Sequence, residues 1–351
     1  MKKRKLRVGI IGTGGIATKQ HIPGWQQIPG AEIRAVCDIN EGAAREVATE
    51  LGIDKVFTDF RKLVALKELD AVDVCTPNQT HAPAVLAGLR ADKHVLCEKP
   101  LATTVREVRQ MAKLAKEKKK VLMTAQHMRF AGMSRALKKF VDKGALGEPY
   151  HAVVRALRRS GLPAWGVFTN KELSGGGPCM DIGVHALDLT MWLMGSPTPV
   201  RVSGATKVNF AKGYDIPNKM GEWDRDAFSV EDWASGYVVF DNGATLTLES
   251  SWLGHHEKRG DLSCDIYGKK ATLQWPAGKY GTHKDGEFVT DELTPLPADR
   301  KPHALEIEAF FDAVVNKKPS PVPAEETIKV IAILEGIYKS QETGREVRVR
   351  L

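Results

Sequence analysis

The first 125 residues alternate between short apolar runs and longer amphipathic segments. Apolar runs rich in Val, Ile, Leu and Cys predict buried strands at 6–11, 32–37, 71–75, 95–97 and 121–124. Between them, polar and apolar positions repeat with helical spacing at 42–51, 59–67, 81–91 and 104–119. Strands that alternate with helices in this way predict a doubly wound α/β domain built on a parallel sheet.

A different pattern follows residue 126. Strand-like stretches recur at 150–156, 200–208, 235–240, 244–252, 262–267 and 271–275, with turn sequences at 241–243 and 268–270. This spacing predicts a mainly antiparallel sheet. A closing helix near 325–341 is expected to pack back on the body of the protein, with the first domain as a candidate surface. We therefore predict two domains, at 1–125 and 126–351.

The first predicted strand runs directly into a glycine-rich turn that has the spacing of a dinucleotide-binding motif. Gly12 permits a tight turn, Gly14 lets the backbone approach a pyrophosphate, and Ala17 keeps the following helix close to the strand. The amino end of that helix supplies an anion site. Gly15 and Ile16 complete the predicted turn.

Asp38 stands at the end of the second predicted strand. A carboxylate at this place accepts hydrogen bonds from the ribose hydroxyls and repels a 2′-phosphate, so NAD is favoured and NADP is the alternative. Arg45 is close enough in sequence to weaken that preference. Asp38 has a second possible role, as the cap of a helix that starts near Glu41.

Two polar loops follow the third and fourth predicted strands. The first runs from Thr76 through Pro77 and Asn78 to His81, and the second is Glu98-Lys99-Pro100. Ligands of doubly wound sheets bind beyond the carboxyl ends of the strands, so Lys99 is predicted to project toward the nicotinamide end of the cofactor. A cis bond before Pro100 would aim the lysine side chain.

Three glycines and Pro178 predict a flexible entry to a helix that is apolar almost all round and ends at Gly195. One face of that helix is polar, with Asp181, His185, Asp188 and Trp192 at helical spacing. Such a stripe requires a wet cavity or a dense hydrogen-bond network. The alternatives to a catalytic stripe are a structural network and a metal site, but no spaced Cys or His pairs accompany it, and no metal is expected.

Composition narrows the function classes. The chain has 42% hydrophobic and 27% charged residues, values typical of globular proteins, and no apolar run long enough for a membrane helix. The net charge of +8 gathers at the N-terminus and at 116–120 without any nucleic-acid-binding motif, so no nucleic acid is expected. The five cysteines include no Cys-x-x-Cys pair, which predicts no disulfide framework. We expect a cytoplasmic protein.

These motifs, in this order, resemble the glucose–fructose oxidoreductase / inositol dehydrogenase (Gfo/Idh/MocA) family. The resemblance spans nearly the whole chain, and its specific part is Glu98-Lys99-Pro100 combined with Asp181-x3-His185. It implies an N-terminal Rossmann domain and a C-terminal α/β domain with a large, open, mainly antiparallel sheet. It also implies a nicotinamide cofactor and sugar or cyclitol substrates. The exposed face of the sheet is a candidate interface for a homodimer or homotetramer.

The expected site residues fall into three groups. Lys99, Asp181 and His185 are the candidate catalytic groups. Cofactor contacts are expected from Gly12, Gly14, Gly15, Ile16, Ala17, Asp38, Thr76, Pro77, Asn78, His81, Glu98 and Lys99. Substrate contacts are expected from Lys99, Arg129, Arg158, Trp165, Asp181 and His185.

The substrate assignments keep alternatives. The resemblance places Arg129 near the substrate, but this residue could instead only brace the seam between the domains. Trp165 beside Arg158 suits a sugar, which offers apolar C–H faces and hydroxyl rims. Trp252 belongs to a second candidate segment of this kind. Loop aromatics that pack over the core are the alternative in both places.

The expected reaction is hydride transfer between NAD(P) and a secondary alcohol or ketone of a sugar, sugar derivative or cyclitol. His185 would take the hydroxyl proton and Lys99 would stabilise charge on the same oxygen, although the two could exchange roles. Asp181 would bind a neighbouring hydroxyl or orient the imidazole. Two other functions remain open, a glycoside hydrolase of the same fold that uses transient oxidation and a non-catalytic sugar or cofactor sensor.

Overall fold

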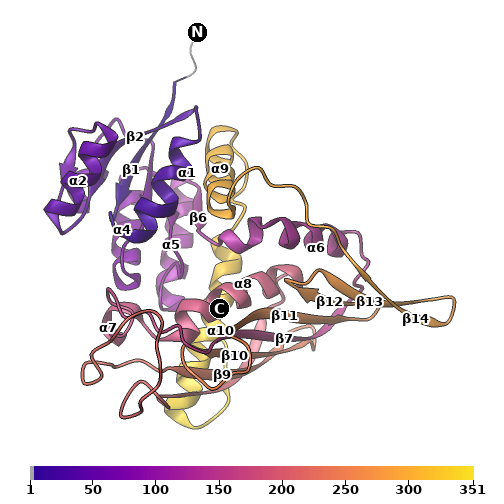
Figure 1. Ribbon diagram of the computed structural model, residues 1–351. Helices are drawn as coiled ribbons and strands as arrows, with labels where there is room; N and C mark the ends of the chain where they lie inside the picture. The colour runs from indigo at the N-terminus through magenta and orange to yellow at the C-terminus, as the bar shows by residue number, and fades with distance from the viewer. Residues whose placement is uncertain (1–3) are drawn as a thin grey trace. The chain divides into compact units, whose positions relative to one another are not determined.

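Two units make up the chain in the computed structural model, which describes residues 4–351 (Figure 1). The first unit consists of residues 4–102, 106–130 and 299–327. The second consists of residues 103–105, 131–298 and 328–351. The boundary predicted after residue 125 stays a prediction.

A six-stranded parallel sheet forms the centre of the first unit, in the order β3-β2-β1-β4-β5-β6. Its central strands read as continuous apolar runs because helices cover both faces of such sheets. The strand order reverses direction between β1 and β4, which is the switch point of a doubly wound fold. The predicted parallel sheet is thus confirmed, with bounds β1 Leu6–Ile11, β2 Ala31–Cys37, β3 Val56–Phe57, β4 Ala71–Val74, β5 His94–Cys97 and β6 Leu122–Thr124.

The helices of this unit include one that the sequence pattern did not reveal. Helix α9 has Pro302 in its first turn, where proline is well tolerated. Its buried face carries Ala304, Ile307, Phe310 and Ala313, a spacing that could have predicted it. The bounds are η1 Ala17–His21, α1 Ile22–Gln26, α2 Glu41–Leu51, α3 Phe60–Val64, α4 Asn78–Arg90, α5 Val105–Lys118, η2 His127–Phe130 and α9 Pro302–Val315.

The second unit contains a nine-stranded sheet in the order β14-β13-β12-β11-β7-β10-β9-β8-β15. Only β7 and β10 pair in parallel, so the sheet is mixed and mostly antiparallel, as predicted. The hairpin of β13 and β14, which was not predicted, extends from one edge (Figure 1). The bounds are β7 Pro149–Arg158, β8 Pro199–Lys207, β9 Trp233–Phe240, β10 Thr245–Ser251, β11 Gly260–Gly268, β12 Thr272–Trp275, β13 Lys279–Lys284, β14 Glu287–Glu292 and β15 Val347–Arg348.

Helices pack on this sheet through its small residues and its apolar face. Helix α8 lies against β7 and β11. Helix α10, the expected closing helix, brings Ile337 against Gly204 and Gly236, where a side chain on either glycine would collide with it. The bounds are α6 Gly132–Asp142, α7 Lys171–Ser174, η3 Cys179–Gly183, α8 Val184–Leu193 and α10 Ala324–Thr343. Helix α6 was not predicted. Across residues 4–351, no helix has both the length and the apolar surface needed to cross a bilayer.

The contact between α1 and α9 gives a test of the first unit's core. The ring of Trp25 meets that of Phe310 edge-on at 6.0 Å between centroids, and both side chains are buried. Replacing Phe310 by Ala should lower the free energy of unfolding by about 3–5 kcal/mol, because it removes buried surface and leaves a cavity. Val315→Ala, on the same helix but 45% exposed, is the matched control and should cost less than about 0.5 kcal/mol. Equal costs in chemical denaturation would contradict this packing.

Glu306, also on α9, is a fully buried carboxyl group. Among the described residues, neither of its carboxyl oxygens has a hydrogen-bond partner. Burial raises the pKa of Glu306 well above its usual value of 4.5; the charge of His21 opposes this rise, and the charges of Glu98 and Asp73 add to it. Burial therefore favours the protonated form of this carboxyl group in the folded protein.

This burial predicts a pH-dependent stability. Because the pKa of Glu306 is higher in the folded state, its contribution is fully present below about pH 4.5 and is lost as the pH rises above that value. The difference in unfolding free energy between Glu306→Gln and the native protein should grow in favour of the variant as the pH rises above about 4.5, by up to about 1.4 kcal/mol per pH unit, until the carboxyl group ionises in the folded state as well. Denaturant titrations at several pH values measure it. A constant difference would show that Glu306 is ionised in the folded state.

Candidate functional site

The glycine turn after β1 has the geometry that a dinucleotide requires. Gly12 has a φ of +94°, and a Cβ there would lie 2.6 Å from the carbonyl oxygen of Cys75. A Cβ on Gly14 or Gly15 would meet nothing within 4 Å, so the backbone is open to an approaching phosphate. Ala17 is fully buried where η1 packs on the sheet. The residues present therefore fit a pyrophosphate at this turn.

Asp38, directly after β2, is hydrogen-bonded to the same turn. Its Oδ2 accepts hydrogen bonds from the backbone N of Thr13 at 2.8 Å and from the Thr13 hydroxyl at 3.2 Å, and its Oδ1 accepts from the N of Asn40. The cap of α2 is Asn40, whose side chain accepts from the N of Ala43. The capping role considered for Asp38 is thus filled by Asn40. A carboxylate has about four acceptor positions, so Asp38 keeps capacity for ribose hydroxyls.

The two polar loops at the carboxyl ends of β4 and β5 are joined by His81. Its ring nitrogens lie 2.7 Å from the carbonyl oxygen of Pro100 and 2.8 Å from that of Thr76. Burial lowers the pKa of His81, whereas its hydrogen bonds to the two carbonyl groups act in the opposite direction. His81 is completely buried, and its two hydrogen bonds link the loops to each other. In the described chain, the buried Oγ1 of Thr76 has no hydrogen-bond partner, which leaves a polar atom available to a ligand.

Glu98 and Lys99 form the turn that follows β5. The Oε2 of Glu98 accepts a hydrogen bond from the backbone N of Lys99 at 3.0 Å, and its Oε1 lies 2.8 Å from Nε2 of His21. Burial opposes ionisation here, but the hydrogen bond and charge of His21 outweigh it and lower the pKa of Glu98 to about 2. The bond between Lys99 and Pro100 is cis. Lys99 thus stands at the same edge of the sheet as the glycine turn.

In the second unit, the helix that carries Asp181 and His185 opens with the π-turn η3 and continues as α8. A single continuous α-helix after Pro178 was the prediction, and the π-turn replaces its first turn. Short π segments of this kind are frequent at functional sites. His185 and Asp188 are buried and Asp181 is partly exposed. Lys138 lies over the ring of Trp192, the last residue of the stripe, at 5.5 Å from the ring centroid.

The three glycines before this helix are tightly packed, which corrects the expectation of a flexible entry. Gly175 has a φ of +80° and lies against Thr103. A Cβ on Gly176 would come within 2.0 Å of the hydroxyl of Tyr338, and one on Gly177 within 2.0 Å of the carbonyl oxygen of Glu231. Close approach of neighbouring groups, not mobility, therefore requires glycine at these positions.

Glu231 anchors the start of this helix, and the sequence pattern gave no sign of it. Its carboxyl oxygens accept hydrogen bonds from the backbone N of Gly177 at 3.0 Å, the N of Cys179 at 3.2 Å and the hydroxyl of Tyr338 at 2.8 Å. Burial raises the pKa of Glu231, and these hydrogen bonds oppose the rise. The three contacts fix the backbone immediately before Asp181.

Asp181 is held by two of the residues that the sequence had grouped with the substrate. Its Oδ2 accepts a hydrogen bond from Nε1 of Trp252 at 3.1 Å and lies 3.7 Å from Nη1 of Arg158. Trp252 is 0% exposed, so it is a partner of Asp181 and not a plate for a sugar ring. Trp165 is 56% exposed and meets Phe168 edge-on at 6.3 Å.

Arg129, expected near the substrate, lies in η2. Its side chain is buried, and its Nη1 lies 2.5 Å from Oε2 of Glu326.

Two groups of potential metal ligands occur in residues 4–351, one at His21, Asp73 and Cys75 and one at His127, His303 and Glu306. Neither group includes Asp181 or His185. The rings of His127 and His303 are stacked with their centroids 3.9 Å apart.

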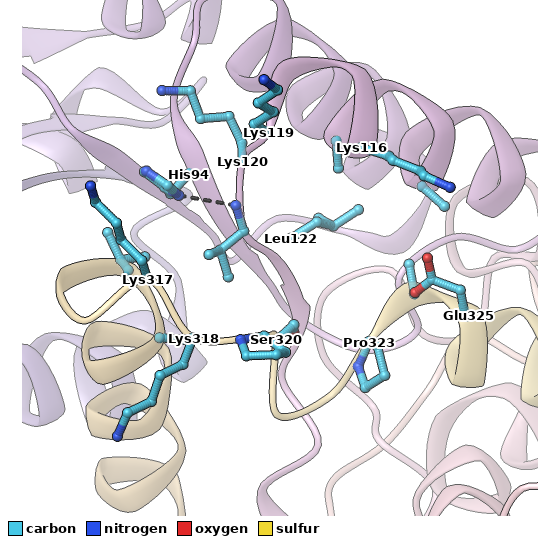
Figure 2. Close-up of a pocket in the computed structure, with 17 residues that line it drawn as sticks. His94, Lys116, Lys119, Lys120, Leu122, Lys317, Lys318, Ser320, Pro323 and Glu325 are labelled. Carbon is cyan, nitrogen blue, oxygen red and sulfur yellow. Dashed lines mark hydrogen bonds between the residues drawn. The ribbon is translucent and has the colours of Figure 1, made fainter.

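A pocket of about 580 Å³ lies at the other end of the first unit's sheet (Figure 2). It is lined by His94 and Leu122, where β5 and β6 begin, and by Lys116, Lys120 and Lys317 among others. Ligands of doubly wound sheets bind at the carboxyl ends of the strands, so this pocket is not the nucleotide crevice. Lys116 lies in the last turn of α5, Lys120 follows that helix, and Lys317 follows α9, so all three complement the negative ends of the helix dipoles.

Comparisons with known proteins agree with this arrangement. The model of GFO_IDH_MocA, an oxidoreductase family with an NAD-binding Rossmann fold, matches residues 6–126, and that of the GFO/IDH/MocA C-terminal domain matches residues 134–274. D-glucoside 3-dehydrogenase of Escherichia coli is 37% identical over 99% of both chains. Myo-inositol 2-dehydrogenase of Thermotoga maritima is 33% identical over 98% of both chains.

Solved structures share the fold. A levoglucosan dehydrogenase in complex with NADH superimposes with a TM-score of 0.83 at 23% identity, over 99% of this chain and 100% of that one. The family models cover both halves of the chain, and the identities above extend over nearly its whole length. The chain therefore belongs to the Gfo/Idh/MocA family of oxidoreductases.

Proposed function

We propose that this protein is an NAD-dependent dehydrogenase that transfers a hydride between NAD and a secondary alcohol or ketone of a sugar, sugar derivative or cyclitol. The main observation behind the proposal is that two loops lie at the carboxyl edge of one parallel sheet. One is the open glycine turn at Gly14, and the other is the fixed turn that bears Lys99. The relatives named above act, by their names, on a glucoside and on an inositol, which supports a polyhydroxylated substrate.

A nicotinamide cofactor bound at the glycine turn would supply the hydride acceptor for oxidation of the alcohol. The chain's own groups bind and orient the reactants. The backbone at Gly14 receives the pyrophosphate, and Asp38 accepts hydrogen bonds from the ribose. Thr76, with its buried and unpartnered hydroxyl oxygen, contributes a further contact.

In the oxidation direction, the ammonium group of Lys99 stabilises the negative charge that develops on the substrate oxygen. His185 takes the proton from the same hydroxyl, because an imidazole nitrogen can accept a proton from a bound alcohol. Asp181, held by Trp252 and Arg158, binds a neighbouring hydroxyl or orients the imidazole. Arg129, Arg158 and Trp165 remain the candidates for further contacts with the sugar.

Two wider features belong to the proposal. All five cysteines are buried and free, which is typical of a reducing compartment and supports a cytoplasmic location. Tyr150 and Tyr237 are large exposed side chains on strands of the second unit's sheet. They support assembly of a homodimer or homotetramer through that sheet.

A substrate panel with single-residue variants tests the reaction. With NAD and a set of cyclitols, aldoses, glucosides and anhydro-sugars, one substrate should produce NADH. Lys99→Ala and His185→Ala should each lower kcat by about 100-fold or more, because charge stabilisation and proton transfer each contribute that much. Their Kd for NAD should change less than about threefold, since neither residue holds the pyrophosphate or the adenosine ribose.

The matched controls are His283→Ala and Lys284→Ala, which remove the same two residue types from exposed positions on β13. Both should keep native kcat. A Lys99→Ala variant that retains more than a tenth of native kcat would exclude the proposed role of Lys99. Substrate cleavage without net NADH would indicate the hydrolase instead, and binding without turnover in either direction would indicate a sensor.

Asp38 should set the cofactor preference. Asp38→Asn keeps an oxygen that can accept from Thr13 but removes the charge that repels a 2′-phosphate. The ratio of kcat/KM with NADP to kcat/KM with NAD should rise by about tenfold, equivalent to about 1.4 kcal/mol. Asp54→Asn, an exposed carboxylate in the same unit, is the control and should leave the ratio unchanged. A native preference for NADP would refute the assignment.

A further inference from the structure

A buried histidine lies beneath the turn that carries Lys99. His21, the last residue of η1, has its Nδ1 2.8 Å from Oδ2 of Asp73 and its Nε2 2.8 Å from Oε1 of Glu98. His21 and Asp73 are fully buried, and Glu98 is nearly so. Asp73 belongs to β4, and Glu98 follows β5. One imidazole therefore bridges carboxylates from two neighbouring strands.

The bridge is part of a longer chain of hydrogen bonds. The Oδ2 of Asp73 also accepts from Nε1 of Trp25 at 2.8 Å. At the other end, the second oxygen of Glu98 accepts from the backbone N of Lys99 at 3.0 Å. The path therefore runs from Trp25 through Asp73, His21 and Glu98 to the backbone of Lys99. Every link is within ordinary hydrogen-bond length.

The geometry specifies the charge on His21. Both ring nitrogens face carboxylate oxygens, and only an imidazolium has two N–H donors. A neutral ring would leave a nitrogen lone pair against a carboxylate oxygen at 2.8 Å unless one of the two carboxyl groups were protonated, and the pKa of Glu98, lowered to about 2, opposes this at Glu98. Although burial lowers the pKa of His21, the charge of Asp73 and its hydrogen bond outweigh that effect and raise it well above the ordinary value.

The other titratable groups packed around His21 do not replace this cation. The Sγ of Cys75 donates to the other oxygen of Asp73, and burial raises the pKa of that thiol to about 12. Burial likewise raises the pKa of Glu306, and it lowers the pKa of His127 to about 3 and that of His303 to about 4. The local balance is two carboxylates against the imidazolium and the ammonium of Lys99. The grouping of His21 with Asp73 and Cys75 is ligand-like, and in this structure its atoms are engaged in the hydrogen bonds described above.

We propose that His21 is a positioning residue for hydride transfer: its imidazolium, held between Asp73 and Glu98, fixes the Glu98-Lys99-Pro100 turn and keeps Glu98 ionised next to Lys99. The inference rests on the proposed function for the catalytic role of Lys99. The charge state of His21 does not depend on that function. The two parts can therefore be tested separately.

Loss of the imidazolium has a specific consequence. In His21→Gln the side-chain amide still donates hydrogen bonds but carries no charge, so two buried carboxylates face each other without a cation between them. One of them must then take up a proton at a pH well above its native range. The turn that carries Lys99 should change with that titration, and kcat should follow it.

The first experiment measures the charge directly in the native protein. With ¹⁵N-labelled histidine, the ring nitrogens of His21, assigned by comparison with His21→Gln, should keep the chemical shifts of an imidazolium from pH 6 to pH 9. A neutral tautomer of His21 at pH 8 would overturn the proposal. This measurement needs no substrate and no folded variant beyond the one used for assignment.

The second experiment measures kinetics. His21→Gln should lower kcat by at least tenfold, change the Kd for NAD by less than about threefold, and add a limb to the dependence of kcat on pH between pH 5 and pH 9. A second substitution, His21→Gln with Glu98→Gln, removes one of the facing charges. It should recover most of the thermal stability lost in the single variant while kcat stays low.

His94→Gln is the matched control. His94 is a half-buried histidine at the amino end of β5, where its Nδ1 accepts a hydrogen bond from the backbone N of Val121 (Figure 2). This variant should keep native kcat and the native pH profile. If folded His21→Gln has native kcat while Lys99→Ala does not, the positioning role is wrong and the proposed function stands. If Lys99→Ala is fully active, the proposed function fails, and the ¹⁵N measurement still decides the charge of His21.

Discussion

Two carboxylates, Asp73 and Glu98, are withdrawn from water when the parallel sheet of the first unit forms. Burial of an isolated carboxylate is very costly, and the cost falls only when a counter-charge and hydrogen bonds replace the lost hydration. His21 supplies the charge and two hydrogen bonds, while Trp25 and the backbone of Lys99 supply two more. The same interactions that offset the free-energy cost of burying these carboxylates therefore also fix the position of the Lys99 turn. This dependence links the stability of the Rossmann unit to the geometry of its site.

The second unit fixes its polar helix by a different means. Glu231 is as deeply buried as Glu98, but its partners are two backbone N–H groups and a tyrosine hydroxyl, with no cation among them. The outcome for ionisation is opposite, because burial raises the pKa of Glu231 whereas His21 lowers that of Glu98 to about 2. Each arrangement holds a backbone segment next to a side chain that we propose to be functional, Lys99 in the first unit and Asp181 in the second. Only the one at Glu98 places a fixed charge beside it.

The sequence predicted those features that depend on local patterns. The buried strands of the Rossmann unit were found because apolar runs of that length bounded by glycine and polar loops have few other structures. Lys99, Asp38 and Asp181 could be proposed as site residues because they belong to motifs at strand ends or on one helix face; their roles stay predictions. Helices α6 and α9 were missed, although the buried positions of α9 do repeat at helical spacing.

Partners that come from distant segments were missed for a physical reason. Glu231 lies more than fifty residues from the glycines it holds, and His21 lies 77 residues from Glu98, so no local pattern connects them. Asp73 could have been recognised in the sequence as a residue that needs a partner, since a charged residue within an otherwise apolar strand requires a buried partner. The identity of that partner follows only from the pairing of β1 with β4 and β4 with β5. Tertiary structure therefore decides which candidates become neighbours.

The double use of Asp38 matters for anyone who wishes to alter the coenzyme specificity of such an enzyme. The carboxylate that we propose to bind the ribose also accepts a hydrogen bond from the backbone N of Thr13 and thereby shapes the glycine-rich loop proposed for the phosphates. Replacing it by a small residue to admit a 2′-phosphate would deprive that loop of an acceptor at the same time. A redesign at this position succeeds only with a side chain that keeps one oxygen in place, together with a separate basic residue to bind the added phosphate. A substitution of Asp38 therefore changes the coenzyme specificity and the shape of the loop at the same time.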